Sequence, residues 1–228
     1  MKQILISGGS KGIGLAIARR FFNGGYKVIA CARGKEALAD LRMELPGVET
    51  YPCDMSDKEA VKAFAAEVME NHGTVDVLVN NAGVFLPGQL HTEEEGILER
   101  LMATNLFSAY YLTKALLPDM VRRGTGTVVN MCSIASIRAY EAGGSYSVSK
   151  FALYGFSKSL REEMKPKGIR VIAVLPGATF TGSWAGTEMP EERFIPAEDV
   201  AEMVWASVHL SDRTVVEDIV LRPQLGDI

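Results

Sequence analysis

Short apolar runs alternate along the chain with longer stretches in which apolar residues recur at helical spacing. The short runs are mostly apolar on both faces and predict strands at residues 4–6, 28–30, 48–53, 75–79, 128–132 and 171–175. The longer stretches predict helices at residues 13–22, 36–45, 57–70, 106–122 and 147–165, followed by a last helix at 197–210 and a last strand at 215–221. Such alternation is typical of a parallel sheet covered on each side. The pattern therefore predicts a doubly wound α/β fold with about seven strands.

No linker, repeat or low-complexity tract divides the 228 residues, so we expect a single domain over residues 1–228. The stretch at 177–195 has weak periodicity and follows the sixth predicted strand. Ligands of such folds bind at the carboxyl ends of the strands, so we interpret this stretch as a mobile lid over that edge. An ordinary long loop is the alternative interpretation.

One helix start carries a capping signal of its own. Ser56 is followed by Glu59 three residues later, which is the spacing of an S-x-x-E capping box. We therefore expect Ser56 to cap the helix predicted at 57–70.

Charge and composition narrow the class of protein. The chain has 24 Lys and Arg residues against 28 Asp and Glu residues, a formal net charge of −4. Because proteins that bind nucleic acid generally carry a basic surplus, we expect no nucleic-acid partner. No apolar run approaches the roughly 20 residues of a membrane span, and too few apolar residues precede Gly8 for a signal peptide. We therefore expect no membrane partner and a cytoplasmic location.

The cysteines and histidines give no sign of a disulfide framework or a metal site. Cys31, Cys53 and Cys132 lie far apart without a CxxC pair, and an odd number of cysteines favours reduced, buried thiols. The three histidines lack the spacing of metal ligands, so we expect no metal.

A glycine-rich turn follows the first predicted strand and opens the first helix. Gly8, Gly12 and Gly14 would let the backbone turn sharply and approach a pyrophosphate, which would then lie at the helix N-terminus. The spacing is G-x-x-x-G-x-G. A tight turn without a ligand is the common alternative, so this motif is informative only in combination with residues later in the chain.

Polar residues follow the later strands in a fixed order. The sequence Asn80-Asn81-Ala82-Gly83 follows the fourth predicted strand, and Ser133 follows the fifth. Tyr146 and Lys150 are four residues apart, which places them on one face of a helix. Together with the glycine-rich turn, this ordered set resembles the short-chain dehydrogenase/reductase family, from the first strand to about residue 193.

The resemblance implies a Rossmann-type fold and a catalytic tetrad of Asn105, Ser133, Tyr146 and Lys150. A phenol has a pKa of about 10 and needs a nearby cation to act as an acid–base group near neutral pH. Lys150 would supply that cation and would also hold the ribose of the nicotinamide. Ser133 would donate a hydrogen bond to the substrate oxygen on which charge develops. Asn105 would hold a water that links Lys150 to bulk solvent.

The resemblance also implies the contacts of a dinucleotide cofactor. Asp54 stands where the adenine amino group is usually recognised, Pro176-Gly177 matches a turn beside the nicotinamide, and Thr179 and Thr181 would face the carboxamide and phosphates. Ser7 replaces the family's usual Thr but keeps a hydroxyl. The expected contacts are Gly8, Ser10, Lys11, Gly12, Ile13, Gly14, Arg33, Asp54, Asn81, Ala82, Gly83, Tyr146, Lys150, Pro176, Gly177, Thr179 and Thr181.

The end of the second predicted strand favours NADP(H) over NAD(H). In dinucleotide-binding folds an acidic residue at this point accepts the adenosine ribose hydroxyls and selects NAD. Ala32 occupies that position, so no carboxylate repels a 2′-phosphate, and Arg33 follows it. Lys11, in the glycine-rich turn, would be a second cation for that phosphate. The alternative is that Arg33 and Lys11 are solvated surface charges.

These features favour an NADP(H)-dependent oxidoreductase that interconverts a small-molecule carbonyl and a secondary alcohol by hydride transfer. A catalytically silent NADP-binding sensor with the same fold is the alternative, although the presence of both Tyr146 and Lys150 argues against it. Arg138 would either recognise an acid group or lie in solvent. The substrate pocket is expected at Ala135, Arg138, Ala139, Tyr140, Phe180 and Trp184, a set that does not identify the substrate.

Two predicted helices carry apolar residues on more than one face. A helix that packs only on its own sheet needs one apolar stripe, so we expect the second face to be buried against another copy of the chain. The resemblance likewise implies a homodimer or homotetramer. The residues concerned are Leu106, Phe107, Tyr110, Tyr111, Leu112, Leu116 and Leu117 in one helix, and Phe151, Leu153, Tyr154, Phe156 and Leu160 in the other.

Overall fold

The computed structural model describes residues 1–184 and 186–227; residue 185 of the expected lid and residue 228 of the expected domain lie outside the described residues. The described residues form a sheet of seven strands in the order β3-β2-β1-β4-β5-β6-β7. Every neighbouring pair is parallel. The strands are β1 (Gln3–Ser7), β2 (Lys27–Ala32), β3 (Glu49–Pro52), β4 (Val77–Asn80), β5 (Gly126–Met131), β6 (Ile169–Pro176) and β7 (Asp218–Leu221).

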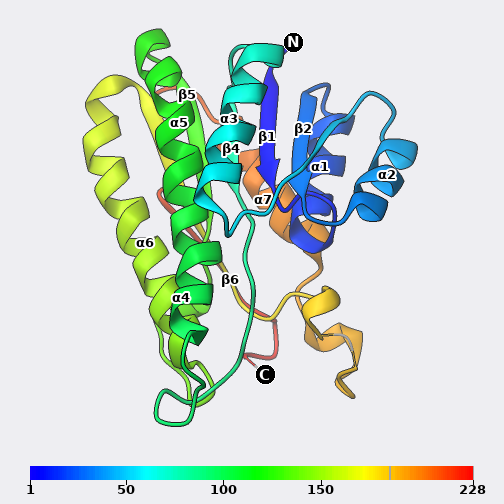
Figure 1. The fold of residues 1–228 in the computed structure, drawn as a ribbon, viewed down its shortest axis with the longest axis vertical. Helices are drawn as coiled ribbons and strands as arrows, with labels where there is room; N and C mark the ends of the chain where they lie inside the picture. Colours follow the sequence, from blue (N-terminus) through cyan, green and yellow to red (C-terminus); the bar gives the residue numbers. More distant parts are fainter. Residues whose placement is uncertain (185, 228) are drawn as a thin grey trace.

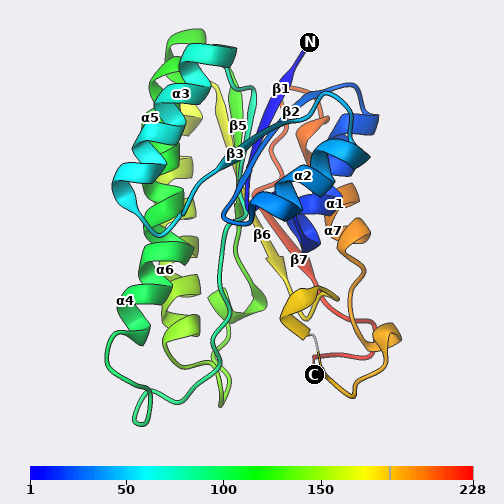
Figure 2. The same ribbon diagram turned by 45° about the vertical axis from the view of Figure 1, so that its right-hand side comes forward.

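Helices cover both faces of this sheet. Figures 1 and 2 show α3, α5 and α6 on one face and α1, α2 and α7 on the other. This arrangement is the doubly wound single domain that the alternating pattern predicts, and it is the Rossmann-type fold that the resemblance implies. The helices are α1 (Gly12–Asn23), α2 (Lys35–Glu44), α3 (Lys58–His72), α4 (Ile97–Met102), α5 (Ser108–Arg123), α6 (Gly144–Met164) and α7 (Ala197–Val208).

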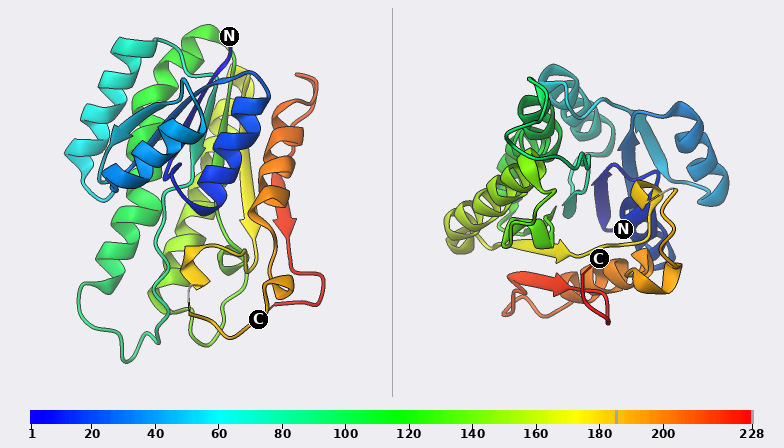
Figure 3. Two further views of the ribbon diagram at one scale, coloured as in Figure 1. Left: turned by 90° about the vertical axis from the view of Figure 1, so that its right-hand side faces the viewer. Right: turned by 90° about the horizontal axis from the view of Figure 1, so that it is seen from below.

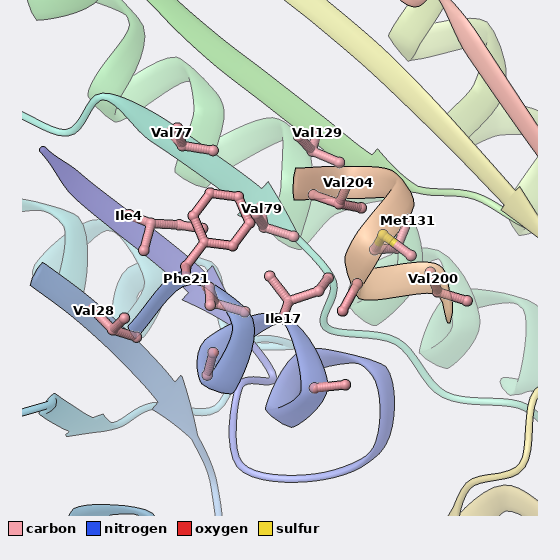
Figure 4. Packing of buried hydrophobic residues seen from close by; sticks show 14 of the residues in the cluster. Ile4, Ile17, Phe21, Val28, Val77, Val79, Val129, Met131, Val200 and Val204 are labelled. Carbon is pink, nitrogen blue, oxygen red and sulfur yellow. The ribbon is translucent and has the colours of Figure 1, made fainter. Parts of the chain in front are cut away.

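The two faces of the sheet have separate apolar cores because successive side chains of a strand point to opposite faces. In β1, Ile4 packs with α1 and α7, whereas Leu5 packs with the helices of the other face. Figure 4 shows the first core, in which Phe21 of α1 is fully buried among residues of the sheet and α7. The ring of Phe21 also meets the ring of Trp205 edge-on, with 5.1 Å between centroids.

The helix expected at 106–122 begins earlier than its periodicity indicates. The chain enters it through α4 and the five-residue π-helical turn η1 (Ala103–Phe107), and α5 continues from there. Of the residues in α4, only Leu101 is buried, so this short helix lacks the apolar stripe from which a helix is predicted. Asn105 lies inside the π turn and not on a regular helix.

Two further expectations about boundaries are wrong. The carboxylate of Asp57, and not the Ser56 hydroxyl, caps α3 by accepting hydrogen bonds from the backbone N–H groups of Glu59 and Ala60. Ser56 instead donates from both its backbone N–H and its hydroxyl to Asp54. The last strand is shorter than expected, because its paired register with β6 begins only at Asp218, although the Glu217 carbonyl still accepts a hydrogen bond from the backbone N–H of Ala173.

The segment at 177–195 lies at the carboxyl edge of the sheet, below β6 and β7 in Figure 3. It contains two short 3-10 turns, Gly182–Trp184 and Glu191–Arg193. A bridge between Thr179 and Ile195 brings its two ends together. The position over the edge agrees with the expected lid, and its mobility stays a prediction.

Candidate active site

The glycine-rich turn needs glycine for two separate reasons. Gly8 and Gly12 have φ angles of +68° and +52°, a region that side chains disfavour. Gly14 has ordinary backbone angles, but a Cβ atom there would lie 2.2 Å from the carbonyl oxygen of Gly8. The backbone of the turn at Gly8 therefore packs directly on the first turn of α1 at Gly14. Thr181 from the 177–195 segment lies against it, since a Cβ atom on Gly12 would be 3.0 Å from the Thr181 methyl carbon.

Ser7 and Asn81 join the ends of β1 and β4 beside this turn. The Ser7 hydroxyl accepts hydrogen bonds from the backbone N–H groups of Asn81 and Ala82, at 3.0 and 3.1 Å. The Asn81 amide donates to the carbonyl oxygens of Ser7 and Gly8, each at 3.0 Å. The Ser7 hydroxyl, which the family's usual Thr would also provide, therefore has a structural role at this junction.

Asn105 is fully buried and hydrogen-bonded on all sides. Its Oδ1 accepts from the backbone N–H of Val84 at 2.8 Å, and its Nδ2 donates to the Val84 carbonyl and the Ser149 hydroxyl at 3.1 and 2.9 Å. A Cβ atom on Gly83 would lie 3.2 Å from Asn105 Oδ1 and 3.6 Å from Lys150 Nζ. Asn105, Gly83 and the Lys150 ammonium therefore share one small polar space.

Lys150 is 7% exposed, and its Nζ donates to the carbonyl oxygen of Met131 at 2.9 Å. Burial disfavours the charged amine and lowers the pKa of Lys150 to about 8. Lys150 Nζ lies 5.9 Å from the centre of the Tyr146 ring. The structure thus places the two residues on one face of α6, as their spacing predicts.

Tyr146 and Ser133 meet at the carboxyl edge of β5. Desolvation by the surrounding protein raises the pKa of Tyr146, and its hydrogen bond with the Ser133 hydroxyl offsets part of that rise. From the sequence we expected Lys150 to lower the pKa of Tyr146. In the structure this pKa is raised, because the effect of burial is the largest. The ring of Phe85 meets Tyr146 edge-on, with 4.9 Å between centroids. Phe85 lies on a loop without periodicity, and sequence reasoning did not single it out.

The N-terminus of the helix that carries Tyr146 is capped from a distant loop. The Glu93 carboxylate accepts hydrogen bonds from the backbone N–H of Ser145, at 2.9 Å, and from its hydroxyl. A carboxylate at this end also complements the positive end of the helix dipole. Sequence reasoning missed Glu93 because it lies 52 residues from its partner.

A cavity of about 680 Å³ opens at these residues. Most of the expected substrate wall lines it, but Phe180 does not line it and packs against Phe194 instead. Arg222 and Asp227, which follow β7, also line the cavity and were missed. The expected residues that line it are Ile13, Asn81, Gly83, Ser133, Ala135, Arg138, Ala139, Tyr140, Tyr146, Lys150, Pro176, Gly177, Thr179, Thr181 and Trp184.

The remaining expected cofactor contacts do not line this cavity; they follow β1, β2 and β3, except Ala82, which follows β4. Lys11, Arg33 and Asp54 are exposed. Hydrogen bonds from Ser56 lower the pKa of Asp54, and the charge of Arg33 contributes in the same direction. Arg33 and Asp54 are therefore neighbours at this corner, as their shared role would require.

Among the helices of the described residues, none is both long enough and apolar enough to cross a membrane.

The family model described as short chain dehydrogenase matches residues 2–191. The sepiapterin reductase of Chlorobaculum tepidum is 35% identical over 243 residues, which covers 100% of this chain and 99% of that protein. Dehydrogenase/reductase SDR family member 7B of Bos taurus is 37% identical over 188 residues, but the match covers 78% of this chain and only 58% of the bovine protein.

The fold is also similar to solved structures of a dehydrogenase and a ketoreductase. An alcohol dehydrogenase from Thermococcus sibiricus, complexed with 5-hydroxy-NADP, has a TM-score of 0.91 and 31% identity, covering 98% of this chain and 97% of that one. A variant of actinorhodin polyketide ketoreductase with NADPH has a TM-score of 0.90 and 30% identity, covering 100% and 98%. With the family model over most of its length and relatives of this identity, the chain belongs to the short-chain dehydrogenase/reductase family.

Proposed function

We propose that the protein is an NADP(H)-dependent oxidoreductase that interconverts a small-molecule carbonyl and a secondary alcohol. The observation that carries this proposal is the pairing of the Tyr146 and Ser133 hydroxyls at one cavity, with the buried Lys150 amine behind them. Two neighbouring hydroxyls suit a single substrate oxygen. One hydroxyl would hold that oxygen by a hydrogen bond, and the other would give it a proton or take one from it.

The residues around the cavity suit a dinucleotide. Gly8, Gly12 and Gly14 add no side chain that would block the approach of a pyrophosphate, and the turn leads into the N-terminus of α1, where backbone N–H groups attract anions. Pro176, Gly177 and Thr179 line the cavity and would hold the nicotinamide end. When bound, the cofactor supplies or accepts the hydride, and the protein orients it.

In the proposed reaction, Ser133 donates a hydrogen bond to the substrate oxygen, and Tyr146 transfers its phenolic proton to that oxygen as the hydride arrives at carbon. The Lys150 ammonium stabilises the phenolate that remains. A pKa of about 8 leaves most of this amine charged at neutral pH. Asn105 acts as a positioning residue, because it holds the backbone of Val84 beside this amine.

The test is substitution of the phenolic oxygen. Tyr146→Phe should lower kcat with NADPH by about a thousandfold or more, because general acid–base catalysis contributes about 10²–10⁴-fold. The substrates are a panel of ketones, diketones and quinones, followed by NADPH absorbance, and the affinity for NADPH should stay near that of the wild type.

Tyr154→Phe is the matched control, since Tyr154 lies on the same helix and does not line the cavity. A Tyr146→Phe variant that keeps more than a tenth of the wild-type rate would refute the acid–base role. NADPH binding by the wild type without turnover of any carbonyl would favour the silent sensor.

The preference for NADP(H) is part of the proposal. Ala32 ends β2 without a carboxylate, and the exposed guanidinium of Arg33 follows it next to Asp54. Lys11 immediately precedes α1. Structural neighbours complexed with NADP, 5-hydroxy-NADP and NADPH support the choice. We expect both cations to contact the 2′-phosphate.

We also propose that the protein acts as a homodimer or homotetramer in the cytoplasm. Large apolar side chains remain exposed on two adjacent helical elements, η1–α5 and α6, which fits burial against a second copy. The free, buried cysteines suit a reducing compartment. A monomer mass by light scattering at micromolar concentration would contradict the assembly. The exposed residues are Phe107, Tyr110, Val148 and Phe151.

A further inference from the structure

A carboxylate of the chain itself lies between two arginines at the catalytic cavity. The Asp227 carboxylate accepts two hydrogen bonds from the Arg222 guanidinium, the Nε–Oδ1 distance being 3.0 Å. Its Oδ2 also lies 4.0 Å from a terminal nitrogen of Arg138. All three residues line the cavity that Tyr146 and Ser133 line. This arrangement is the one by which arginines recognise a carboxylate ligand.

The two arginines reach this point from strands on either side of β6. Arg138 follows Ser133 by way of the short 3-10 turn at Ile134–Ser136, and Arg222 directly follows β7. The end of β6 lies between them: the backbone N–H of Gly177 donates to the carbonyl of Leu221 at 2.8 Å. A Cβ atom on Gly177 would lie 3.6 Å from the Cα of Arg222. The backbone of Arg222 is therefore fixed against the cavity wall.

The charges of the described cavity residues are unequal. Lys150, Arg138 and Arg222 are cationic, and Asp227 is the one carboxylate among the lining residues that the structure describes. Lys150 is buried and bonded to the backbone, so Asp227 balances the two guanidinium groups. If Asp227 moved away, the cavity would attract an anion.

Asp227 is held weakly enough to be exchanged. Its side chain is 35% exposed, and those of Arg222 and Arg138 are 44% and 71% exposed. Exposed ion pairs contribute little to stability, so replacing this internal carboxylate by another requires little free energy. Asp227 follows Gly226, whose φ of +86° marks a tight turn and not a regular element.

We propose that the substrate is a carbonyl compound that carries a carboxylate, an oxo acid or the corresponding hydroxy acid, and that it displaces Asp227 from Arg222 and Arg138. This inference rests on the proposed oxidoreductase function and names the substrate class of the same cavity. Asp227 occupies the place that the substrate carboxylate would take, and the reacting carbonyl of a bound substrate lies toward Ser133 and Tyr146.

The experiment compares acids with their methyl esters, which keep the carbonyl and remove the charge. Acetoacetate and levulinate, each with its methyl ester, are reduced with NADPH by the wild-type protein. We expect kcat/KM to be at least about tenfold higher for one of the acids than for its ester, because a charge-assisted hydrogen bond is worth about that factor or more. The advantage should shrink as salt is added.

Variants then assign the preference to the arginines. Arg222→Gln and Arg138→Gln should each lower the acid-to-ester ratio of kcat/KM, Arg222→Gln by about tenfold and the more exposed Arg138 by less. Asp227→Ala should lower KM for the acid by about threefold, because it removes the internal competitor. Arg213→Gln is the matched control, since this exposed arginine lies on the loop that leads into the amino end of β7, whereas Arg222 follows the carboxyl end of that strand.

Each other outcome has a definite meaning. Reduction of the esters as fast as the acids, or a ratio that survives Arg222→Gln, would overturn the inference and leave the proposed function intact. A rise in KM for NADPH in Arg222→Gln, with the ratio unchanged, would assign this arginine to the cofactor and also overturn it. Failure to reduce any carbonyl, ester or acid would overturn the proposed function and this inference with it.

Discussion

The two halves of the site are built in different ways. In the proposed cofactor half, which is the loops after β1, β2 and β3, the charged residues Lys11, Arg33 and Asp54 lie exposed on turns. In the catalytic half, Asn105 and Lys150 are buried beside β4 and β5 and are bonded to neighbouring backbone. Side chains that select a ligand can lie in solvent. Side chains that take part in proton transfer need fixed positions, and contacts in the protein interior provide them.

Most polar side chains of the buried half are hydrogen-bonded, because an unpaired polar group in the interior is strongly destabilising. A chain of side-chain bonds crosses this half of the sheet: Asn80 donates to Thr113 and Asn130, each at 2.8 Å, and Asn130 donates to Ser157 at 2.9 Å. The comparison therefore predicts that substitutions in the catalytic half change stability and activity together. Substitutions in the cofactor half should change selectivity alone.

The largest effect on stability is expected for Asn105→Ala. The change leaves both backbone polar groups of Val84 without their partner and removes the hydrogen bond that Ser149 Oγ accepts, so the free energy of unfolding should fall by about 2–4 kcal/mol. Urea unfolding measures this change, and kcat should fall with it. The control is Asn23→Ala, at the exposed end of α1. Equal stability of the two variants would break the comparison.

A smaller effect, confined to selectivity, is expected for Arg33→Ala. Loss of a charge-assisted contact with a 2′-phosphate should lower the ratio of kcat/KM for NADPH to that for NADH by about ten- to a hundredfold, or about 1.5–3 kcal/mol. The free energy of unfolding should change by less than about 0.5 kcal/mol. Lys11→Ala should act in the same direction, and Arg213→Ala should not. Equal use of both cofactors by the wild type would contradict the assignment.

The smallest effect is a gain in stability from Lys150→Met, accompanied by loss of activity. Burial lowers the pKa of Lys150 from 10.5 to about 8, so its charge destabilises the folded wild type below pH 8. Between pH 8 and 10.5 the unfolded chain binds more protons than the folded one, and wild-type stability therefore rises with pH.

The variant should be about 1–2 kcal/mol more stable at pH 7, since the lost bond to Met131 offsets part of the gain, and this advantage should shrink toward pH 10. Thermal unfolding at pH 7 and pH 9.5 gives the measurement. A variant less stable than the wild type at pH 7 would show that the buried amine is fully compensated.

The sequence predicts the parts of this molecule that depend on local pattern. Strands apolar on both faces give the parallel sheet, and Tyr146 and Lys150 share a face because four residues separate them along one helix. Asp57 takes the cap expected of Ser56, because both residues are good caps and the backbone at Ser56 turns toward Asp54. Pattern alone does not separate two adjacent capping residues.

The features that the sequence does not predict depend on contacts between distant segments. Phe85 reaches Tyr146 from the loop after β4, and Arg222 meets the cavity only because β7 pairs with β6. Neither residue carries a local signal, because its neighbours are decided by the order of the strands. The same holds for Glu93, whose carboxylate caps α6 from a loop.

The π turn at Ala103–Phe107 has a consequence for how one continuous helical segment is used. An extra residue in a turn shifts the phase of all following side chains by about 100°. Before the turn, α4 packs against α6; after it, α5 packs mainly against α3 and the sheet and touches α6 only lightly. The turn thus changes the main packing partner of the helical segment. It does so at Asn105, whose side chain is buried. Deleting one residue here would restore an even helix and misdirect Asn105, which an unchanged helical circular-dichroism signal with lost activity would reveal.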